Sequence, residues 1–148
     1  MSVFILDEIH VTLKLCTYLF IFLQLWITGG FTSKFSTEIV TKTEARSGPT
    51  LAHEMYWHCS ARINNTHVIL MGGRESGFKS YIYNLNDFYQ YYYGPDLSVE
   101  RKGCAATQII HPNGTAFIII VGPSDTSEIL NTNDIFGEWL KGEIFKNL

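Results

Sequence analysis

Two histidines, a glutamate and a tryptophan lie within six residues of one another, at His53, Glu54, Trp57 and His58. A metal site needs two or three such side chains that converge on one point. Residues 99–101, which have the same place in a second, similar part of the chain, include no histidine. We therefore interpret the cluster as polar residues of a loop and predict no metal site.

Two further sets of side chains are candidates for binding. The tyrosine run at Tyr89, Tyr91, Tyr92 and Tyr93 is of a type that stacks on sugars or bases. It falls in a predicted strand, however, where we expect it to pack within a sheet and along an exposed edge. Four charged residues form either ion pairs between repeats or contacts with a partner, and both alternatives stay open: Glu54, Arg74, Glu100 and Arg101.

The motifs of common catalytic sites are missing from the sequence. It has no nucleophile elbow, phosphate-binding loop, metal-ligand spacing or paired-carboxylate motif. We therefore predict that the chain is not an enzyme and binds no cofactor. The net charge is −3, with acidic and basic residues interspersed, which gives no reason to expect a nucleic-acid partner.

One pattern occurs twice, at an interval of about 46 residues. A Gly-Pro-x-Leu segment starts at Gly48 and again at Gly94, and a cysteine followed by small residues comes later in each copy, at Cys59 and Cys104. In both copies an apolar run then ends at glycine and a second β-favouring run begins at serine. Self-similarity at such a period predicts stacked supersecondary units.

Each unit is predicted to contain four short strands. In the first unit these are residues 58–63, 68–71, 79–84 and 88–93, and in the second they are residues 103–110, 115–121, 126–131 and 135–140. No window of useful length shows a helical period. The sequence therefore predicts an all-β fold, a partial β-propeller whose four-stranded antiparallel blades span about 48–93 and 94–142.

The units resemble the kelch-repeat family of β-propellers. Its repeats carry a double glycine after the second strand, a tyrosine in the third and a tryptophan in the fourth. In the second unit Pro123 replaces the second glycine and Leu130 replaces the tyrosine. The residues that carry the resemblance are Gly72, Gly73, Tyr83 and Tyr91 in the first unit, and Gly122 and Trp139 in the second.

The resemblance implies a non-catalytic binding module that recognises a protein or a glycan through the loops between its blades. Two alternatives stay open. One is a fragment of a propeller enzyme similar to galactose oxidase, with its catalytic residues in other blades. The other is an intracellular kelch adaptor. Some kelch propellers are copper oxidases, but we find no set of tyrosine and histidine residues here that would hold copper.

A third, partial copy precedes the two units. Gly29-Gly30 resembles the end of a second strand, but Ile39 lies only nine residues before Gly48, whereas Ile82 lies twelve before Gly94. We therefore predict a lone strand at residues 37–41 rather than a complete blade. Because a propeller needs about four to eight blades, we expect a truncated product or a fragment of a longer protein. Assembly of several copies into one ring is the alternative.

The N-terminal residues differ in character from the repeats. From residue 15 to residue 27 only Thr17 and Gln24 are not apolar. We interpret residues 1–30 as a signal peptide cleaved after Gly30, so that residues 31–148 form the propeller part of a secreted or extracellular protein. A signal peptide predicts an appendage, helical or not, that makes few contacts with the blades.

Two other interpretations of the apolar run stay open. One is a membrane anchor, although the run is short for a membrane span, which takes about 20 residues; a membrane contact is expected only if the run is not cleaved. Alternatively it contains a buried strand, in which Trp26 and Ile27 pair with Ile39 and Val40 across a hairpin at residues 31–34.

Two features favour secretion. Asn64 and Asn113 begin N-glycosylation sequons at equivalent hairpin tips. Cys59 and Cys104 would both remain after cleavage at Gly30. A disulfide needs Cα atoms within about 7 Å, closer than equivalent inner-strand positions of neighbouring blades usually come, so we predict two free thiols.

Overall fold

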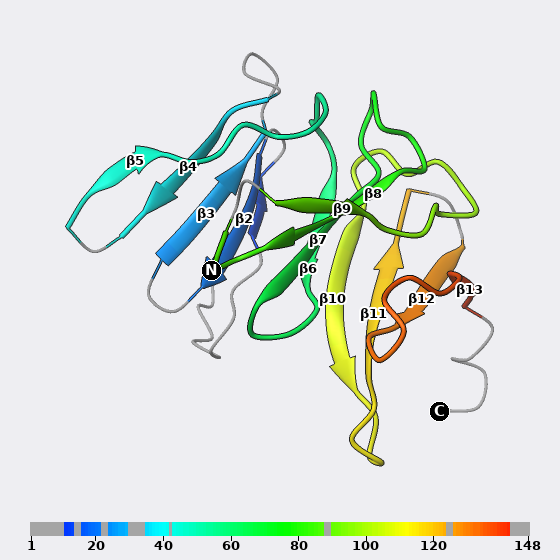
Figure 1. The fold of residues 1–148 in the computed structure, drawn as a ribbon. Coiled ribbons are helices and arrows are strands. Elements are labelled where there is room, and N and C mark those ends of the chain that lie inside the picture. Colours follow the sequence, from blue (N-terminus) through cyan, green and yellow to red (C-terminus); the bar gives the residue numbers. More distant parts are fainter. Residues whose placement is uncertain are drawn as a thin grey trace.

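The computed structural model describes residues 11–13, 16–21, 24–29, 35–41, 43–87, 90–123 and 126–142. Within these ranges the chain is all-β, with three antiparallel sheets and no helix. No helix of the described part is therefore long and apolar enough to cross a membrane. Figure 1 shows the sheets side by side in chain order, from the blue and cyan strands to the yellow and orange ones.

The first sheet has the strand order β1-β2-β3-β4-β5. Its strands are β1 (Val11–Leu13), β2 (Cys16–Ile21), β3 (Gln24–Thr28), β4 (Thr37–Val40) and β5 (Ala45–Ser47). The second sheet contains β6 (Cys59–Arg62), β7 (His67–Met71), β8 (Ser80–Asn84) and β9 (Tyr91–Tyr93) in that order. The third contains β10 (Ala105–Ile110), β11 (Ala116–Val121), β12 (Ser127–Asn131) and β13 (Leu140–Lys141).

The two predicted four-stranded units are confirmed as the second and third sheets. One strand of the third sheet differs from the prediction, because residues 135–140 form a strand only from Leu140 onward. Two successive turns occupy the preceding residues, where Asp134 N–H donates to Asn131 O and Gly137 N–H donates to Asp134 O. The outer strand of this sheet is therefore short.

The prediction of a lone strand at residues 37–41 is wrong. β4 pairs with β3 on one side and with β5 on the other, so the first sheet contains the same four strands as its neighbours, with β1 added. The nine residues before Gly48 suffice because a tight turn joins β4 to β5. In it Thr41 N–H donates to Glu44 O, and the Thr41 hydroxyl oxygen accepts the Glu44 N–H.

The expectation of an N-terminal appendage is also wrong for the described residues. The apolar run supplies β2 and β3, and Trp26 is buried in the core. Trp26 pairs with Ile39, as the buried-strand alternative predicts, but Ile27 pairs with Glu38 rather than with Val40, because the strands run antiparallel. The predicted hairpin at residues 31–34 lies outside the described residues.

The repeated glycine of each unit has one structural role. Gly48, Gly94 and Gly142 each donate their N–H to the carbonyl oxygen of the first residue of a third strand, which is Thr37, Ser80 or Ser127. A Cβ at any of these glycines would collide with the hydroxyl oxygen of that residue. The Thr37 and Ser80 hydroxyls also donate to the carbonyl oxygens of Pro49 and Pro95. Glycine is required because the hydroxyl occupies the space of a side chain.

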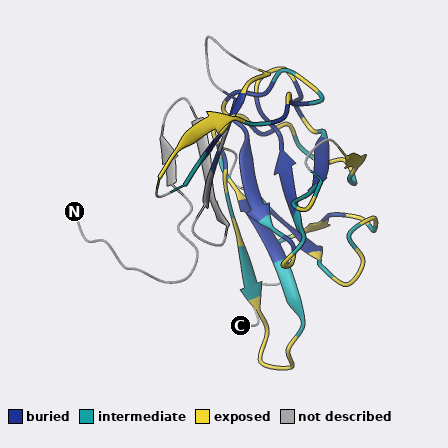
Figure 2. Cartoon of the chain, turned by 60° about the vertical axis from the view of Figure 1, so that its left-hand side comes forward, coloured by how far each residue is buried: buried dark blue, intermediate teal, exposed yellow. Residues whose placement is uncertain are grey.

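Two apolar clusters form the core, one on each face of the second sheet. Val68, Leu70 and two tyrosines of this sheet pack with Trp26 and Ile39 of the first sheet. Ile69, Met71 and Ile82 pack on the other face with residues of the third sheet. In Figure 2 the buried residues accordingly fill the middle strands, whereas hairpin tips and β5 are exposed.

The glycine–hydroxyl contact yields a double-mutant test. We expect Gly94→Ala to cost about 2 kcal/mol of unfolding free energy, since it overpacks a filled site. Ser80→Ala should cost about 1 kcal/mol for the lost hydrogen bond to Pro95. Removal of the Ser80 hydroxyl makes room for the new methyl group, so the double variant should cost clearly less than the sum of the two. Urea unfolding of the four proteins measures this, and strict additivity would contradict the proposed contact.

Candidate ligand-binding loops

One end of the molecule is built from the connections between sheets and from the loops that follow the second strands. We call this the loop end: residues 48–58, 72–79, 94–104 and the described part of 122–126. Hydrogen bonds join its segments across sheets. Gly73 N–H donates to Arg101 O, Arg74 N–H to Tyr56 O and Gly103 N–H to Trp57 O, at 2.7, 3.0 and 2.7 Å. The loops therefore form one connected surface.

The four residues of the predicted cluster at 53–58 do not converge. His53 stacks on Tyr81, with ring centroids 5.0 Å apart. His58 is buried, and its Nε2 lies 2.8 Å from the Thr28 hydroxyl. Trp57 is 39% exposed, and Glu54 is half-buried. Among the described residues no three His, Cys, Asp or Glu side chains are grouped so that they could hold a metal ion.

Trp57 has a backbone conformation that is unusual for its type. Its φ is 59°, and it is the one residue other than glycine with positive φ in the described chain. Gly103, 46 residues later, has the equivalent place in the next connection and a φ of 73°. A large side chain in this left-handed region costs about 1 kcal/mol or more and is associated with functional sites. The partly exposed indole therefore marks the loop end as the candidate site.

Aromatic and charged side chains surround the indole. The Tyr56 ring lies 5.7 Å from the Trp57 ring, and the Arg74 guanidinium stands over Tyr56 at 5.9 Å. The Tyr56 hydroxyl donates to the Glu75 carboxylate at 3.0 Å. The exposed indole, backed by the buried Tyr56 and bordered by the exposed Arg74 and Glu75, suits stacking on a sugar ring or on an apolar side chain, with polar contacts at its border.

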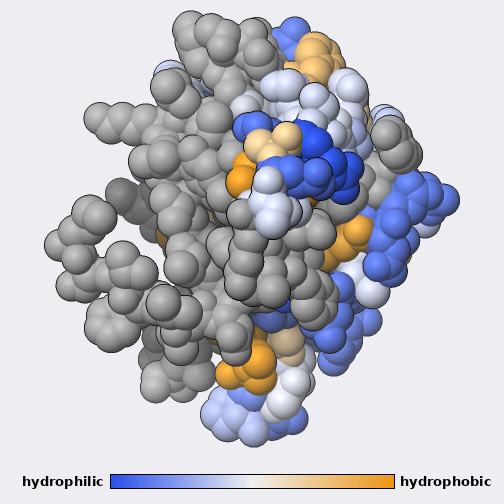
Figure 3. Space-filling view, turned by 90° about the vertical axis from the view of Figure 1, so that its left-hand side faces the viewer, coloured by the Kyte–Doolittle hydropathy of each residue, from blue (hydrophilic) through white to orange (hydrophobic). Residues whose placement is uncertain are grey.

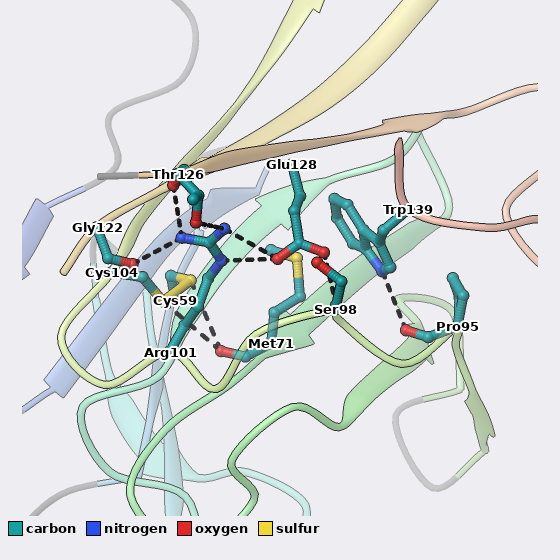
Figure 4. A network of polar contacts seen from close by, with 10 residues as sticks. All are labelled: Cys59, Met71, Pro95, Ser98, Arg101, Cys104, Gly122, Thr126, Glu128 and Trp139. Atoms are coloured by element: carbon teal, nitrogen blue, oxygen red, sulfur yellow. Dashed lines mark hydrogen bonds and ion pairs between the residues drawn. A yellow bond between two sulfur atoms is a disulfide. The ribbon is translucent and has the colours of Figure 1, made fainter. Parts of the chain in front are cut away.

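A buried ion pair fixes the connection between the second and third sheets, residues 94–104 (Figure 4). Arg101 and Glu128 are both fully buried, and Nε and Nη2 of the arginine donate to Oε1 of the glutamate at 3.0 and 2.9 Å. Nη1 donates to the carbonyl oxygens of Gly122 and Thr126. The second carboxylate oxygen accepts the Ser98 N–H at 2.6 Å. The pair thus ties residues 94–104 to β12 and to the loop that precedes it.

The sequence left open whether Glu54, Arg74, Glu100 and Arg101 form ion pairs between repeats or meet a partner. Arg101 makes a buried ion pair, with Glu128. Arg74 and Glu100 lie at the surface, where Glu100 is 3.4 Å from Lys102. The partner Glu128 was not a candidate, because it lies within a predicted strand rather than in a loop. The pairing could have been found from the repeat, since Arg101 and Glu128 replace the buried Met55 and Tyr81 of the preceding unit.

Cys59 and Cys104 form a disulfide, so the prediction of two free thiols is wrong. Their Cα atoms are 5.5 Å apart. The reason is the register: Cys59 pairs with Met71, directly before Gly72, but the residue paired with Val121, directly before Gly122, is Ala105. Cys104 therefore lies one residue before the position equivalent to Cys59. This offset brings the sulfurs of neighbouring inner strands together.

The repeat residues that carry the resemblance hold the fold rather than a site. Gly72, Gly73 and Gly122 have positive φ. The Tyr83 hydroxyl accepts the Ala52 N–H at 2.9 Å, and the Trp139 indole donates to Pro95 O at 3.0 Å, so both rings anchor a connection. Tyr91 is 39% exposed on the outer strand β9.

The two sequon asparagines are exposed at the opposite end of the sheets. Asn64 lies in the β6–β7 hairpin and Asn113 in the β10–β11 hairpin, the yellow hairpin at the bottom of Figure 1. Each uses its side-chain oxygen to accept a backbone N–H two residues later, from Thr66 and Thr115. Their amide nitrogens therefore lie at accessible turns.

No protein-family model matches this sequence, and no curated protein matches it.

Burial makes His58 a source of acid sensitivity. Desolvation lowers the pKa of His58 from 6.5 to about 4. The stability contributed by the neutral ring is thus fully present above pH 6.5 and is lost as the pH falls toward 4. Since one pKa unit corresponds to about 1.4 kcal/mol, the loss is about 3 kcal/mol. Urea unfolding at pH 7 and pH 4 should show that His58→Gln loses less stability on acidification than the wild type. His111→Gln, in the exposed β10–β11 hairpin, is the control and should behave as the wild type does.

The ion pair should respond differently to one substitution than to two. Glu128→Gln leaves a buried cation without its carboxylate, and we expect it to cost about 3 to 5 kcal/mol. Arg101→Met combined with Glu128→Leu removes both charges and copies the apolar solution of the preceding unit. This double variant should be the more stable one in thermal unfolding. A double variant at least as unstable as Glu128→Gln would contradict this prediction. It would show that the ion pair stabilises the protein by more than the cost of burying its two charges.

Proposed function

We propose that this chain is part of a kelch-type β-propeller that acts as a non-catalytic binding module, and that it recognises a protein or a glycan through the loop end. The observation that carries the proposal is Trp57, a partly exposed tryptophan at a backbone position where the next unit has glycine. A residue that is strained and exposed contributes little to the fold, so a binding role explains its presence.

The surroundings of Trp57 support a rigid recognition surface. The disulfide holds the inner strands of the second and third sheets together, and the Arg101–Glu128 pair fixes the neighbouring connection. Preorganised loops lose little conformational entropy on binding. Tryptophan and arginine are also among the residues that most often dominate binding energy at interfaces, and both are exposed here, as Trp57 and Arg74.

We further propose an oxidising, glycosylating compartment and hence a secreted or extracellular protein. The disulfide and the two exposed sequons support it. Glycans on Asn64 and Asn113 would project from the end opposite to the loop end and leave the proposed site clear. Because Trp26 is part of the core, the proposal keeps β2 and β3 in the folded protein and abandons cleavage after Gly30.

Trp57→Gly separates binding from folding, because glycine is the residue that the equivalent position already has. We expect the variant to keep its unfolding free energy within about 1 kcal/mol, since the loss of packing on Tyr56 is offset by relief of the positive φ. Ligands are first selected with the wild type on a glycan array and from a phage-displayed peptide library. Their affinity for Trp57→Gly should then fall at least tenfold.

Ile110→Ser is the control, because Ile110 is also an exposed apolar residue, 70% exposed at the opposite end. Its affinities should equal those of the wild type. Selected ligands that bind Trp57→Gly as tightly as the wild type would refute the proposed site.

A further inference from the structure

The outer strand of the second sheet differs from the other two outer strands. β5 contains Arg46 and β13 contains Lys141, whereas β9 consists of three tyrosines and has no charge. Tyr91, Tyr92 and Tyr93 are 39%, 45% and 63% exposed. Charged residues on an edge strand protect it from pairing with other chains. β9 lacks this protection, and among the described strands only β8 pairs with it.

The hydrogen bonds of β9 show which backbone groups are available. Gly94 N–H donates to Ser80 O and Asn84 N–H donates to Gln90 O, so the even-numbered residues of this stretch bond to β8. In an antiparallel ladder the alternate residues direct their N–H and C=O to the other side. Tyr91 and Tyr93 therefore present two donors and two acceptors along the edge, at the spacing of an extended strand.

Side chains extend this edge on both faces of the sheet. On one face the rings of Tyr91 and Tyr93 pack over the buried Tyr83 and Tyr81, with centroids 5.8 Å apart in each pair. On the other face the Tyr92 ring lies nearly perpendicular to the ring of Phe136, in the loop between β12 and β13, with centroids 6.4 Å apart. Phe136 is itself 62% exposed. A strand laid along β9 would thus find an aromatic surface for its alternating side chains.

Two acidic side chains border this surface. Asp134 and Glu138 are exposed in the loop that carries Phe136, whereas Lys79, before β8, is paired with Asp96. By contrast, the described surface on the side of the first sheet is largely hydrophilic and shows its hydrophobic atoms as small separate spots (Figure 3). The edge of β9 with Phe136 is therefore a distinct aromatic surface with an acidic border.

We propose that β9 is the docking site for an extended peptide segment of a partner protein, which adds to the second sheet as a fifth strand. The segment alternates β-branched or aromatic residues with lysine or arginine. Backbone hydrogen bonds to Tyr91 and Tyr93 hold it in register, and contacts with the tyrosines and Phe136 select its side chains. This surface lies on the outer strand, apart from the loop end, and does not depend on the function proposed for Trp57.

A phage-displayed library of random 12-residue peptides is the probe, selected on the wild-type chain and depleted on Tyr92→Lys. We expect the enriched peptides to show the alternating pattern. A synthetic copy of an enriched peptide should bind the Tyr92→Lys variant of the chain with a Kd at least tenfold higher than that for the wild type. When the backbone amides of the peptide are N-methylated one at a time, methylation at every second residue should abolish binding. Methylation at the residues between should be tolerated, because only alternate amides donate hydrogen bonds to β9. Amide exchange at Tyr91 and Tyr93 should slow when the peptide binds.

Leu140→Lys, which adds the same charge to the outer strand of the third sheet, and Trp57→Gly are the controls and should leave the Kd unchanged. Three results would overturn the proposal. The first is that no enriched peptide depends on Tyr92, and the second is that N-methylation acts without the two-residue period. The third is that the wild type alone forms a dimer that Tyr92→Lys dissociates, which would assign the edge to a second copy of this chain.

Discussion

The structure depends on a second sheet that is apolar on both of its faces. β7 directs Val68 and Leu70 toward the first sheet and Ile69 and Met71 toward the third, and all four side chains are fully buried. A strand of this kind is stable only if both faces are covered, because apolar area exposed to water costs about 25 cal/mol per Å². The second sheet is therefore stable only with both neighbouring sheets packed against it. The connections between the sheets must hold them in contact.

Those connections solve the same packing problem in two chemically different ways. Met55 and Tyr81 fill the space between connection and sheet in one unit, and Arg101 and Glu128 fill it in the next. An apolar pair tolerates small displacements, whereas a buried ion pair is favourable only with its full set of hydrogen bonds. The second connection is thereby held to a single position. The disulfide joins the second sheet to the end of the same connection, so the third sheet is fixed to the second by specific contacts in addition to apolar packing.

The repeat made most of the second and third sheets predictable, because strands, turns and glycines recur there at nearly constant spacing. For the first sheet the number of strands was underestimated. The distance in sequence between repeated residues depends on the length of the loops as well as on the number of strands, and the short connection between β4 and β5 shortens this unit without removing a strand. The disulfide was missed for a related reason. A spacing of 45 residues resembles the repeat interval, yet it differs by one residue from the 46 that separate Cys59 from its true counterpart Ala105, and in a strand one residue changes the face.

The sequence singled out the loop that contains the candidate site, but it did so for its histidines. His53 and His58 attracted attention as possible ligands, although one stacks on a tyrosine and the other is buried. The signal that mattered was a departure from the repeat: tryptophan stands where the next unit has glycine. The tyrosine run in place of a charged outer strand is a departure of the same kind. Positions that obey the repeat are explained by the fold, since their contacts recur in each sheet. Positions that break it at a cost, in strain at Trp57 or in an unprotected edge at β9, have no such explanation, and it is there that binding is to be sought.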